Sequence, residues 1–554
     1  MEAFFIANMA PIMFGALVVF LLLGYPAAFS LGAVGLLFGL IGIELGQFAP
    51  DFLQALPERI YGVMNNDTLL AIPFFTFMGL VLERSGMAED LLDTIGQLFG
   101  TVRGGLAYAV VFVGALLAAT TGVVAASVIS MGLISLPIML RYGYDRRVAT
   151  GVIAASGTLA QIIPPSIVLI VMADQLGRSV GDMYEGAFIP GLVLSGLYAA
   201  YVFLITLIAP KAAPGLPPEA IGFRESNGSR GLTSLGVLAL ASAVFAWLVM
   251  RNSTSHGADY VVLSLFFGIL FAFAVAVVGW VIARLTGYRI LSHIAQQTTF
   301  VMVPPLFLIF LVLGTIFIGV ATPTEGGAMG ATGAVILGLV KRRLSWDLVR
   351  QATESTAKLA AFVVFILVGA RVFSLTFYGV SGHIWVEHLL TSLPGGQIGF
   401  LVFVNLFVFV LAFFLDFFEL AFIVIPLLGP AAEHLGIDLI WFGVILGVNM
   451  QTSFMHPPFG FALFYLRSVS PREPYNDRVT GKLMEPITTG QIYWGAVPFV
   501  FIQVAMVLLV IMFPAMVMHY KGAGTGIDPN KVKIEVPQIQ LPPPLEFGAP
   551  PNIK

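Results

Sequence analysis

Two proline pairs interrupt apolar stretches of the chain: Gly157-Thr-Leu-Ala-Gln-Ile-Ile-Pro-Pro-Ser166 and Asn449-Met-Gln-Thr-Ser-Phe-Met-His-Pro-Pro-Phe-Gly460. Proline lacks the amide proton and clashes with the preceding turn, so each pair predicts a broken helix. A further proline precedes each pair by 27 residues, a Gly-x-Asp turn lies between them, and all these landmarks recur at one displacement of 293 residues. Two broken membrane helices at matching positions in two halves are the best sequence pointer to a transporter's binding site.

The composition places the chain in a membrane. Of its 554 residues, 58% are hydrophobic and only 10% are charged, whereas soluble domains carry about 25% charged residues. The net charge of −3 leaves no basic surface for nucleic acid. The chain has no cysteine, which excludes disulfides and thiolate metal sites. The N-terminal apolar run lacks a basic leader and a cleavage site, which predicts a retained span.

Apolar runs of about 20 residues, the length that crosses a bilayer, recur along the chain. We predict spans at 4–23, 26–43, 68–84, 146–172, 187–208, 232–250, 260–283, 301–319, 323–340, 359–378, 439–466 and 491–516. Residues 86–100, 341–358 and 380–393 are expected to be interfacial helices or solvated connectors.

Two longer apolar stretches, 104–140 and 397–433, carry small or polar residues at their centres. We interpret them as helix–turn–helix hairpins that enter the membrane and return, a geometry tolerated only inside protein or beside water. The alternative is a pair of ordinary spans joined by a tight loop.

Charge favours the hairpin interpretation. The loop 141–147 after the first hairpin is basic, whereas the matching loop 433–438 contains no lysine or arginine. The positive-inside rule places the two loops on opposite sides of the membrane. An inverted-topology repeat requires this arrangement.

The predicted fold class is an all-α polytopic membrane protein with an inverted repeat, two re-entrant hairpins and two broken helices, divided into a scaffold and an elevator transport domain. The segments are 1–103 (scaffold helices and an interfacial arm), 104–176 (first half of the transport domain), 177–300 (connecting helices with two extra spans), 301–396 (scaffold helices and arms of the second repeat), 397–466 (second half of the transport domain), 467–518 (a loop and the last span) and 519–554 (a flexible proline-rich tail).

No enzyme motif is present: the chain lacks His-Glu-x-x-His, a phosphate-binding glycine loop and Gly-x-Ser-x-Gly. No soluble segment is long enough to be a nucleotide-binding domain. Transport is therefore expected to draw on an ion gradient or on a partner chain.

A broken helix frees backbone carbonyls that can bind a cation, and the N-terminus of each half-helix favours a carboxylate. We therefore predict one Na⁺ site where each hairpin tip meets its broken helix, and a substrate site between the two. The predicted Na⁺ residues are Thr120, Thr121, Gly122, Ser127, Gly157, Thr158 and Pro164 in the first half, and Leu415, Asp416, Asn449, Thr452, Ser453 and Pro457 in the second. The predicted substrate residues are Thr121, Ser166, Ser453 and Arg371. The alternatives are hydroxyls bonded back to their own helices, and an Arg371 that pairs with a carboxylate between helices. For Glu325 we favour a cap at a helix start.

Gly122 to Ser127, Pro-Pro-Ser166, Ala321-Thr-Pro-Thr-Glu325 and Ser453-Phe-Met-His-Pro-Pro-Phe-Gly-Phe461 occur in one order that resembles the large membrane subunit of tripartite ATP-independent periplasmic (TRAP) transporters. The resemblance covers nearly all of 5–518. It implies Na⁺-coupled import of an organic acid across the bacterial inner membrane, with a small membrane subunit and a periplasmic substrate-binding protein as partners. It also implies a fold like that of the ion transporter superfamily, with Na⁺ at the tips and breaks.

The chain departs from many such relatives in two places. The second tip, Leu415-Asp-Phe-Phe-Glu419, is more aromatic, and 209–290 is longer by two spans. Both features resemble the branch associated with mannitol, chloroaromatic and 2-oxo acid substrates. The substrate is accordingly expected to be a small carboxylate, such as a 2-oxo acid or a C4 dicarboxylate. The rival interpretations are a stand-alone Na⁺/dicarboxylate symporter or antiporter without partners, and a channel or structural membrane component.

Overall fold

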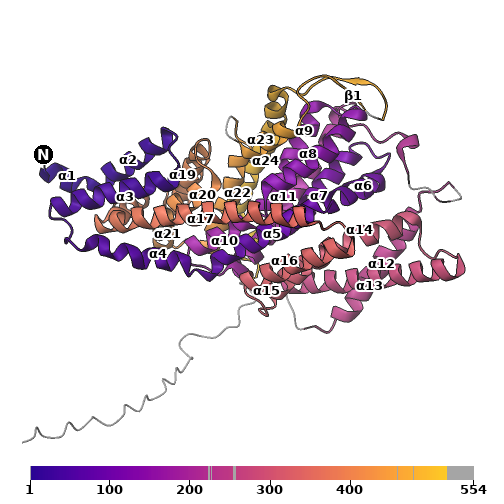
Figure 1. Ribbon diagram of the computed structural model, residues 1–554, viewed down its shortest axis with the longest axis horizontal. Coiled ribbons are helices and arrows are strands. Elements are labelled where there is room, and N and C mark those ends of the chain that lie inside the picture. The colour runs from indigo at the N-terminus through magenta and orange to yellow at the C-terminus, as the bar shows by residue number, and fades with distance from the viewer. Residues whose placement is uncertain are drawn as a thin grey trace, which may run out of the picture.

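The protein is almost entirely helical (Figure 1). The computed structural model describes residues 2–520 except 223–224, 226–227, 254–256, 458–459 and 478, and the side chains of 121 and 257–259 are also outside the description. The predicted tail therefore lies outside the described residues beyond Tyr520, as does the second proline of the pair at 457–458. Within the described part, nine helices are long and apolar enough to cross a membrane, or up to eleven if two bent pairs count as spans.

One group of helices provides a compact frame. Its members are α1 (Glu2–Ala7), α2 (Met9–Leu22), α3 (Ala27–Glu44), α4 (Leu56–Met64), α5 (Ala71–Arg84), α16 (Pro323–Val340) and α17 (Trp346–Gly379), with 3-10 turns at Phe52–Ala55 and Asp67–Leu70. The backbones of α3 and α17 are in close contact. A Cβ on Gly35 would lie only 2.8 Å from the Phe373 backbone. Small residues allow such close contact between membrane helices. Helices α5 and α16 form a second tight pair.

Helix α17 corrects one boundary of the sequence prediction. Residues 341–358 were expected to be separate from a span at 359–378, but one helix of 34 residues covers most of both (Figure 1). The charges of this segment lower its hydropathy without weakening its helix. Ser345 caps the first turn by accepting from Leu348 N, and Arg350 and Glu354 form an i,i+4 ion pair.

The predicted hairpins and broken helices are present as helical elements. The first set is α6 (Met87–Phe99), α7 (Gly105–Thr121), α8 (Val124–Arg141), α9 (Arg146–Thr158) and α10 (Ile167–Gln175). The second is α18 (Gly382–Thr391), α19 (Gly396–Leu411), α20 (Phe417–Glu419), α21 (Ile425–His434), α22 (Leu439–Met450) and α23 (Phe461–Val469). Asp145 caps α9 and Asp438 caps α22, each by accepting from the backbone amides two and three residues later. Equivalent elements thus begin at equivalent positions of the two sequence repeats.

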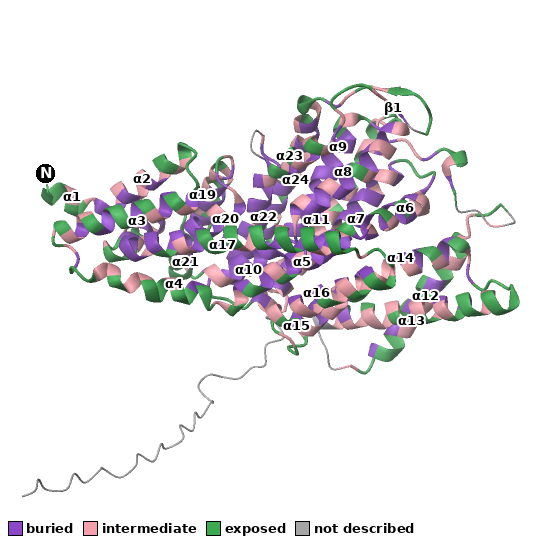
Figure 2. Cartoon of the chain, viewed as in Figure 1, coloured by how far each residue is buried: buried purple, intermediate pink, exposed green. Residues whose placement is uncertain are grey.

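A peripheral group packs beside this body. It contains α12 (Leu232–Met250), α13 (Gly257–Thr286), α14 (His293–Ile309) and α15 (Thr315–Phe317), while α11 (Val180–Ile208) connects to it through a loop with a 3-10 turn at Pro218–Ala220. Figure 2 shows few buried residues on α12 and α13, whereas α8, α10 and α22 are largely buried. The two extra spans predicted from the sequence therefore form an outer layer.

Two more predicted spans differ in their ends. The first span is divided at Asn8, whose Nδ2 donates to Phe4 O. The span predicted at 301–319 begins earlier, at His293, and passes through Pro304 and Pro305 before a wider π-helical turn at Phe310–Gly314. The pair Pro304–Pro305 does not break its helix, so a Pro-Pro dipeptide is not sufficient for a break.

The chain ends with α24 (Thr489–Met512) and α25 (Ala515–Met518), after a loop with two short antiparallel strands, β1 (Tyr475–Asn476) and β2 (Leu483–Met484). Arg141 at the end of α8 holds this loop, because its Nε and Nη2 both donate to Asp477 Oδ1. These bonds hold the pKa of the Asp477 carboxyl well below its ordinary value. The loop is thus fixed to the first hairpin.

Helices α9 and α24 meet through two glycines. A Cβ on Gly151 would collide with the carbonyl of Gly495, and one on Gly495 would collide with that of Arg147. We expect Gly151→Leu to lower the apparent melting temperature of the detergent-solubilised protein by about 5 °C or more, because overpacking forces the helices apart. Gly196→Leu on α11 is the matched control, since its Cβ meets open space. Equal melting temperatures for the two variants would contradict this packing.

Candidate functional site

The tip of the first hairpin lies against the first helix break. Gly122 ends α7 in the left-handed conformation, with φ of +59°, and its N–H donates to Ala118 O. A Cβ at this position would lie 3.1 Å from the carbonyl oxygen of Pro165. Only glycine adopts this conformation at little cost and also leaves room for the neighbouring carbonyl. The tip and the break are therefore fitted to each other.

Ser166 closes the first break. After α9 the chain makes a 3-10 turn at Leu159–Gln161, passes through Pro164 and Pro165, and resumes as α10. The Ser166 hydroxyl donates to the Gln161 carbonyl and accepts from Leu169 N, so it satisfies groups on both sides of the break. It is fully buried. Its observed role is to stabilise the broken backbone.

The second break has the same order of elements. Helix α22 passes into a 3-10 turn at Gln451–Phe454, and α23 begins at Phe461. The Thr452 hydroxyl donates to Asn449 O at 2.7 Å and the Ser453 hydroxyl to Met450 O at 2.6 Å. A hydroxyl that donates its proton in this way still has an oxygen lone pair to offer a cation.

The second hairpin tip is a reciprocal cap. Glu419 N donates to Asp416 Oδ1 at 2.8 Å, and Asp416 N donates to Glu419 Oε2 at 3.1 Å. The two carboxylates therefore satisfy the first amides of α20. Leu415 is buried just before this cap. The second tip meets its own break through His456, whose ring lies 4.4 Å from that of Phe409 and 4.1 Å from that of Phe413.

A cavity of about 120 Å³ lies where the tips and breaks converge. Its lining comes from tip 1, both breaks, tip 2 and the neighbouring α10, α17 and α23: Gly122, Val123, Val124, Ala125, Gln161, Ile167, Val168, Leu359, Phe417, Phe418, Phe454 and Tyr465. We call it the tip cavity. Elements that are nearly 300 residues apart in sequence thus share one small chamber with the frame helix α17.

A buried polar network joins the two breaks. Gln451 Nε2 donates to Thr158 Oγ1 at 3.1 Å, and these two residues are separated by 293 positions, the displacement of the sequence repeat. Gln503 Nε2 donates to the same Thr158 oxygen at 3.3 Å and to the Tyr198 hydroxyl at 2.9 Å. The equivalent ends of α9 and α22 therefore touch at the centre of the molecule.

Three amide oxygens in this region have no hydrogen-bond partner among the described residues: Gln161 Oε1, Gln451 Oε1 and Gln503 Oε1. Each of these side chains is almost completely buried. An unpaired buried carbonyl oxygen is costly, and it is also a ligand type that hard cations accept. The residues present therefore fit a Na⁺ ion held by neutral oxygens. In the described part of the chain, no three His, Asp or Glu side chains gather as an alternative metal site.

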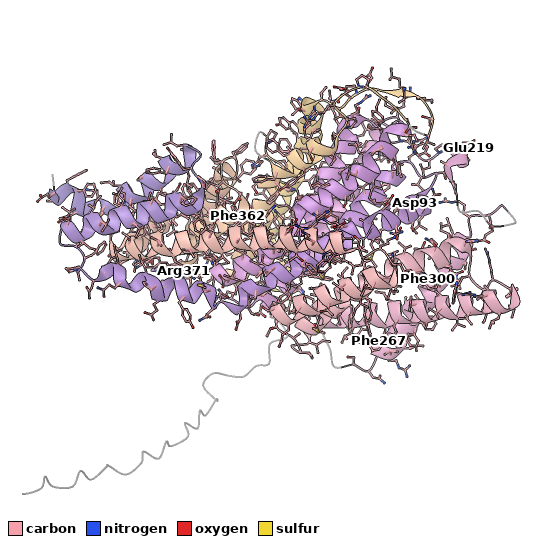
Figure 3. All side chains as sticks on the ribbon, viewed as in Figure 1. Asp93, Glu219, Phe267, Phe300, Phe362 and Arg371 are labelled. Atoms are coloured by element: carbon pink, nitrogen blue, oxygen red, sulfur yellow. The ribbon has the colours of Figure 1, made fainter. Side chains whose placement is uncertain are left out.

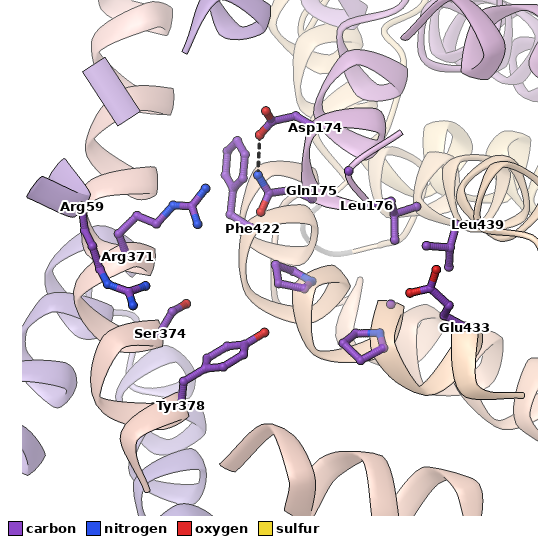
Figure 4. A pocket seen from close by; sticks show the side chains of 14 residues that line it. Arg59, Asp174, Gln175, Leu176, Arg371, Ser374, Tyr378, Phe422, Glu433 and Leu439 are labelled. Atoms are coloured by element: carbon purple, nitrogen blue, oxygen red, sulfur yellow. Dashed lines mark hydrogen bonds between the residues drawn. The ribbon is translucent and has the colours of Figure 1, made fainter. Parts of the chain in front are cut away.

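A second polar cavity, of about 420 Å³, separates the frame from the hairpin-bearing body (Figure 4). Arg59 of α4 and Arg371 of α17 enter it from one side, and Asp174 and Gln175 face them across the gap. We call it the arginine cavity. The carboxylate partner of the alternative interpretation of Arg371 is not found: neither guanidinium has an ion-pair or hydrogen-bond partner within the described residues.

The acidic groups of the arginine cavity are already engaged. The Asp174 carboxylate accepts from Asn66 Nδ2 and from Gln175 Nε2, both at 2.7 Å. Glu433 pairs with Arg178 at 2.9 Å. The two arginines are thus the uncompensated charges of the cavity, and they favour an anionic occupant.

A model of the DctM component of tripartite ATP-independent periplasmic transporters matches residues 14–516. The chain belongs to this family. The match includes both tips, both breaks and both cavities, and it agrees with the resemblance seen in the sequence motifs.

Similar proteins carry transporter names. The C4-dicarboxylate TRAP transporter large permease protein DctM of Pseudomonas aeruginosa is 28% identical over 428 residues, 76% of this chain and 82% of that one. Its counterpart in Rhodobacter capsulatus is 26% identical, covering 83% and 90%. The isethionate TRAP transporter permease protein DctMQ of Oleidesulfovibrio alaskensis is 23% identical, covering 92% of this chain and 66% of that one. These names agree with the prediction that the chain is a multi-pass membrane transporter component and not an enzyme.

Among solved structures, the Alcanivorax borkumensis YdaH transporter aligns with a TM-score of 0.49 at 15% identity, covering 84% of this chain and 90% of that one.

The structure of this DctM-family protein brings part of the predicted site together. Gly122 lines the tip cavity, and Thr158 lies in the polar network. The Thr120 hydroxyl donates back to Leu117 O, the alternative arrangement for such hydroxyls. The hydroxyls of Thr158, Thr452 and Ser453 likewise donate to the carbonyl three residues earlier. A Cβ on Gly157 would collide with Val128, which follows Ser127, so α8 contacts the first break there. Pro164 lies inside the same break.

Other predicted residues are distributed differently. Asn449 Nδ2 donates to Asn405 O and Oδ1 on α19, which ties the second break to its hairpin. The predicted substrate residues do not share one cavity, because Arg371 lines the arginine cavity whereas Ser166 and Ser453 line neither. The side chain of Thr121 is outside the described residues, and Pro457 lies at the edge of an undescribed pair. Glu325 forms the expected cap, with Thr322 N donating to its carboxylate.

The sequence reasoning missed Gln161, Gln451, Gln503 and Arg59. The first two were visible as polar residues next to the breaks in otherwise apolar surroundings. Gln503 and Arg59 belong to helices distant in sequence, and only the tertiary fold directs them at the site.

Proposed function

We propose that this DctM-family protein is the permease of a sodium-coupled importer for a small organic acid. In this proposal, a periplasmic binding protein delivers the acid and a small membrane subunit accompanies the chain. The observation that carries the proposal is the tip cavity, where both hairpin tips and both helix breaks converge. The family's description as one component of a tripartite periplasmic transporter supports the partners, and the fused DctMQ relative supports the small subunit.

The sodium sites in this proposal lie at the breaks, with Thr452 and Ser453 as hydroxyl ligands at the second break. The unpaired amide oxygens of Gln161 and Gln451 support this placement, because they are neutral, buried and beside freed backbone carbonyls. Binding Na⁺ there offsets the charge of a carboxylate held at the half-helix N-termini. If the protein moves only when Na⁺ and the carboxylate are both bound, the sodium gradient drives import of the acid.

The substrate class in the proposal is a carboxylate of C4-dicarboxylate or 2-oxo acid size. Two unpaired guanidiniums in the arginine cavity support an anion, since Arg and carboxylate form paired charge-assisted hydrogen bonds. The cavity volume of about 420 Å³ is at the small end of ligand pockets. The names of the P. aeruginosa and R. capsulatus relatives point to the same class.

The movement we propose is an elevator, with 104–176 and 397–466 as one mobile body and the frame helices as the fixed one. The recurrence of equivalent elements at a displacement of 293 residues supports an inverted repeat, in which the two tips approach the centre from opposite sides. Gly86 and Gly100 flank α6 and Gly104 precedes α7, all with positive φ, and Gly395 and Gly396 at the start of α19 also have positive φ. In the proposal these glycines supply joints between the bodies.

The test is uptake into proteoliposomes that contain the chain, its small subunit and the binding protein, under an inward Na⁺ gradient. We expect saturable uptake of radiolabelled succinate or a 2-oxo acid that is lost when K⁺ replaces Na⁺. Ser453→Leu is expected to abolish it, because the leucine fills the second break. Ser468→Leu is the matched control, since Ser468 makes the same i−3 hydrogen bond at an exposed position of α23. Sodium-independent uptake, or normal uptake by Ser453→Leu, would refute the proposed coupling site.

A further inference from the structure

A basic cavity lies far from the tips and breaks, between the end of α13 and the start of α14. Its volume is about 560 Å³, and it is lined by Trp280, Arg284, Arg289, His293, Gln296, Gln297, Phe300 and Ala283. We call it the basic cavity. The transport proposal assigns no role to any of these residues, so a ligand bound in this cavity is independent of that proposal.

The basic cavity has unpaired positive charge. Within the described residues, neither Arg284 nor Arg289 has an ion-pair partner, and the Arg284 guanidinium lies over the Trp280 ring at 5.3 Å from its centroid. The Glu225 carboxylate accepts from His293 N at 2.6 Å, so it is engaged by the first turn of α14. Two exposed guanidiniums and two side-chain amides therefore face the cavity as donors.

The depth of the cavity matches a membrane surface. Its lining starts at Trp280, after the long apolar part of α13. Tryptophan and arginine are typical of the layer between hydrocarbon and water. Arg284 and Arg289 make the junction between α13 and α14 basic, and the positive-inside rule places such a segment on the cytoplasmic side. Basic pockets between membrane helices at that level bind phospholipid head groups.

An apolar chamber continues from the basic cavity into the membrane. Phe300 lines the basic cavity and packs edge-on against Phe273 at 6.0 Å between ring centroids. Phe273 in turn lines a chamber of about 440 Å³ between α13, α14 and α16, with Leu270, Phe307 and Ile336 exposed around it. Figure 3 labels Phe300 on α14 and Phe267 on α13, at the layer where these helices meet. The basic cavity thus lies where a lipid head group would bind, and the apolar chamber lies where its acyl chain would follow.

We propose that the basic and apolar cavities together bind one anionic phospholipid, with its phosphate on Arg284 and Arg289 and an acyl chain in the chamber beyond Phe273. A bare phosphate would satisfy the arginines but not the apolar chamber. A zwitterionic lipid would fill the chamber but would bring a second positive charge toward the arginines. The site therefore selects for a negatively charged head on a hydrocarbon tail.

The test is native mass spectrometry of the purified, delipidated full-length protein titrated with dioleoyl phosphatidylglycerol. We expect one phosphatidylglycerol to bind at least tenfold more tightly than dioleoyl phosphatidylcholine. Arg284→Gln and Arg289→Gln should each weaken phosphatidylglycerol binding about fivefold, as expected for one basic residue at a charged membrane surface. Arg251→Gln, an exposed arginine elsewhere on the peripheral group, is the matched control and should bind as wild type.

Further measurements distinguish binding of a whole lipid from binding of a phosphate group alone. Inorganic phosphate at millimolar concentration should not displace the bound phosphatidylglycerol, and displacement would overturn the lipid assignment in favour of a simple anion site. Equal binding of the two lipids, or unchanged binding in both glutamine variants, would also overturn the proposal. Should a variant not fold, raising the salt from 0.05 M to 0.5 M with wild-type protein gives an independent readout, since weaker phosphatidylglycerol binding is expected and unchanged binding contradicts it.

Discussion

Gly122→Val should reduce uptake below about one hundredth of the wild-type rate while the protein still inserts and purifies normally. A β-branched residue at a φ of +59° strains the end of α7, and its Cβ would press on the Pro165 carbonyl at 3.1 Å. The tip must therefore move away from the break. The proposed sodium and substrate sites both depend on that contact, so even a small displacement is expected to stop transport.

Gly143→Val is a control that distinguishes backbone strain from the contact between the hairpin tip and the helix break. Gly143 has a φ of +82° after α8, but a Cβ there meets nothing within 4 Å. Both variants carry similar backbone strain, and only Gly122→Val disturbs the break. We expect Gly143→Val to keep most of its uptake in the same proteoliposomes. Equal loss in both variants would mean that backbone strain, and not the fit of tip to break, limits transport.

Arg59→Gln combined with Arg371→Gln should raise the KM for a dicarboxylate about 10- to 100-fold, the usual contribution of charge-assisted hydrogen bonds. Both guanidiniums face the arginine cavity without partners among the described residues. The rate at saturating substrate is expected to change less, because the tips and breaks are intact. Initial uptake rates over a range of substrate concentrations measure the two effects separately.

Two comparisons sharpen this result. Arg371→Lys keeps the charge but loses the two-pronged geometry, so we expect an intermediate KM. Arg472→Gln removes an exposed arginine from the loop after α23 and should leave KM unchanged. A wild-type KM in the double variant would exclude the arginine cavity from the substrate's route.

Much of the architecture could be predicted from local sequence signals. The spans at 232–250 and 323–340 have the predicted ends, since each is apolar along most of its length and is followed at once by a basic residue, Arg251 or Lys341. The breaks at the two repeated proline pairs were also predicted correctly. The pair Pro304–Pro305 carried the same local signal and gave a continuous helix. What distinguishes the broken cases is the tertiary setting, in which Ser166 and the first hairpin tip satisfy the interrupted backbone.

The candidate site was less predictable, because its polar residues are selected by packing. Gln451 and Thr158 are predictable as neighbours of breaks, but their mutual hydrogen bond depends on how the two halves are docked. Gln503 and Tyr198 enter the same network from α24 and α11. Arg371 was predicted as a substrate residue, yet the second arginine of the cavity, Arg59, could not be assigned without knowing which helix faces α17.

The length of α17 has a consequence for which body travels. Its 34 residues span about 51 Å, some 20 Å more than the hydrocarbon layer. The surplus must stand at its first half, where Asp347, Arg350, Glu354 and Lys358 are clustered. Dragging even one such charge into the lipid costs at least about 2.5 kcal/mol. These charges therefore hold α17 at a fixed height in the membrane, so in the proposed elevator the frame is the part that stays in place.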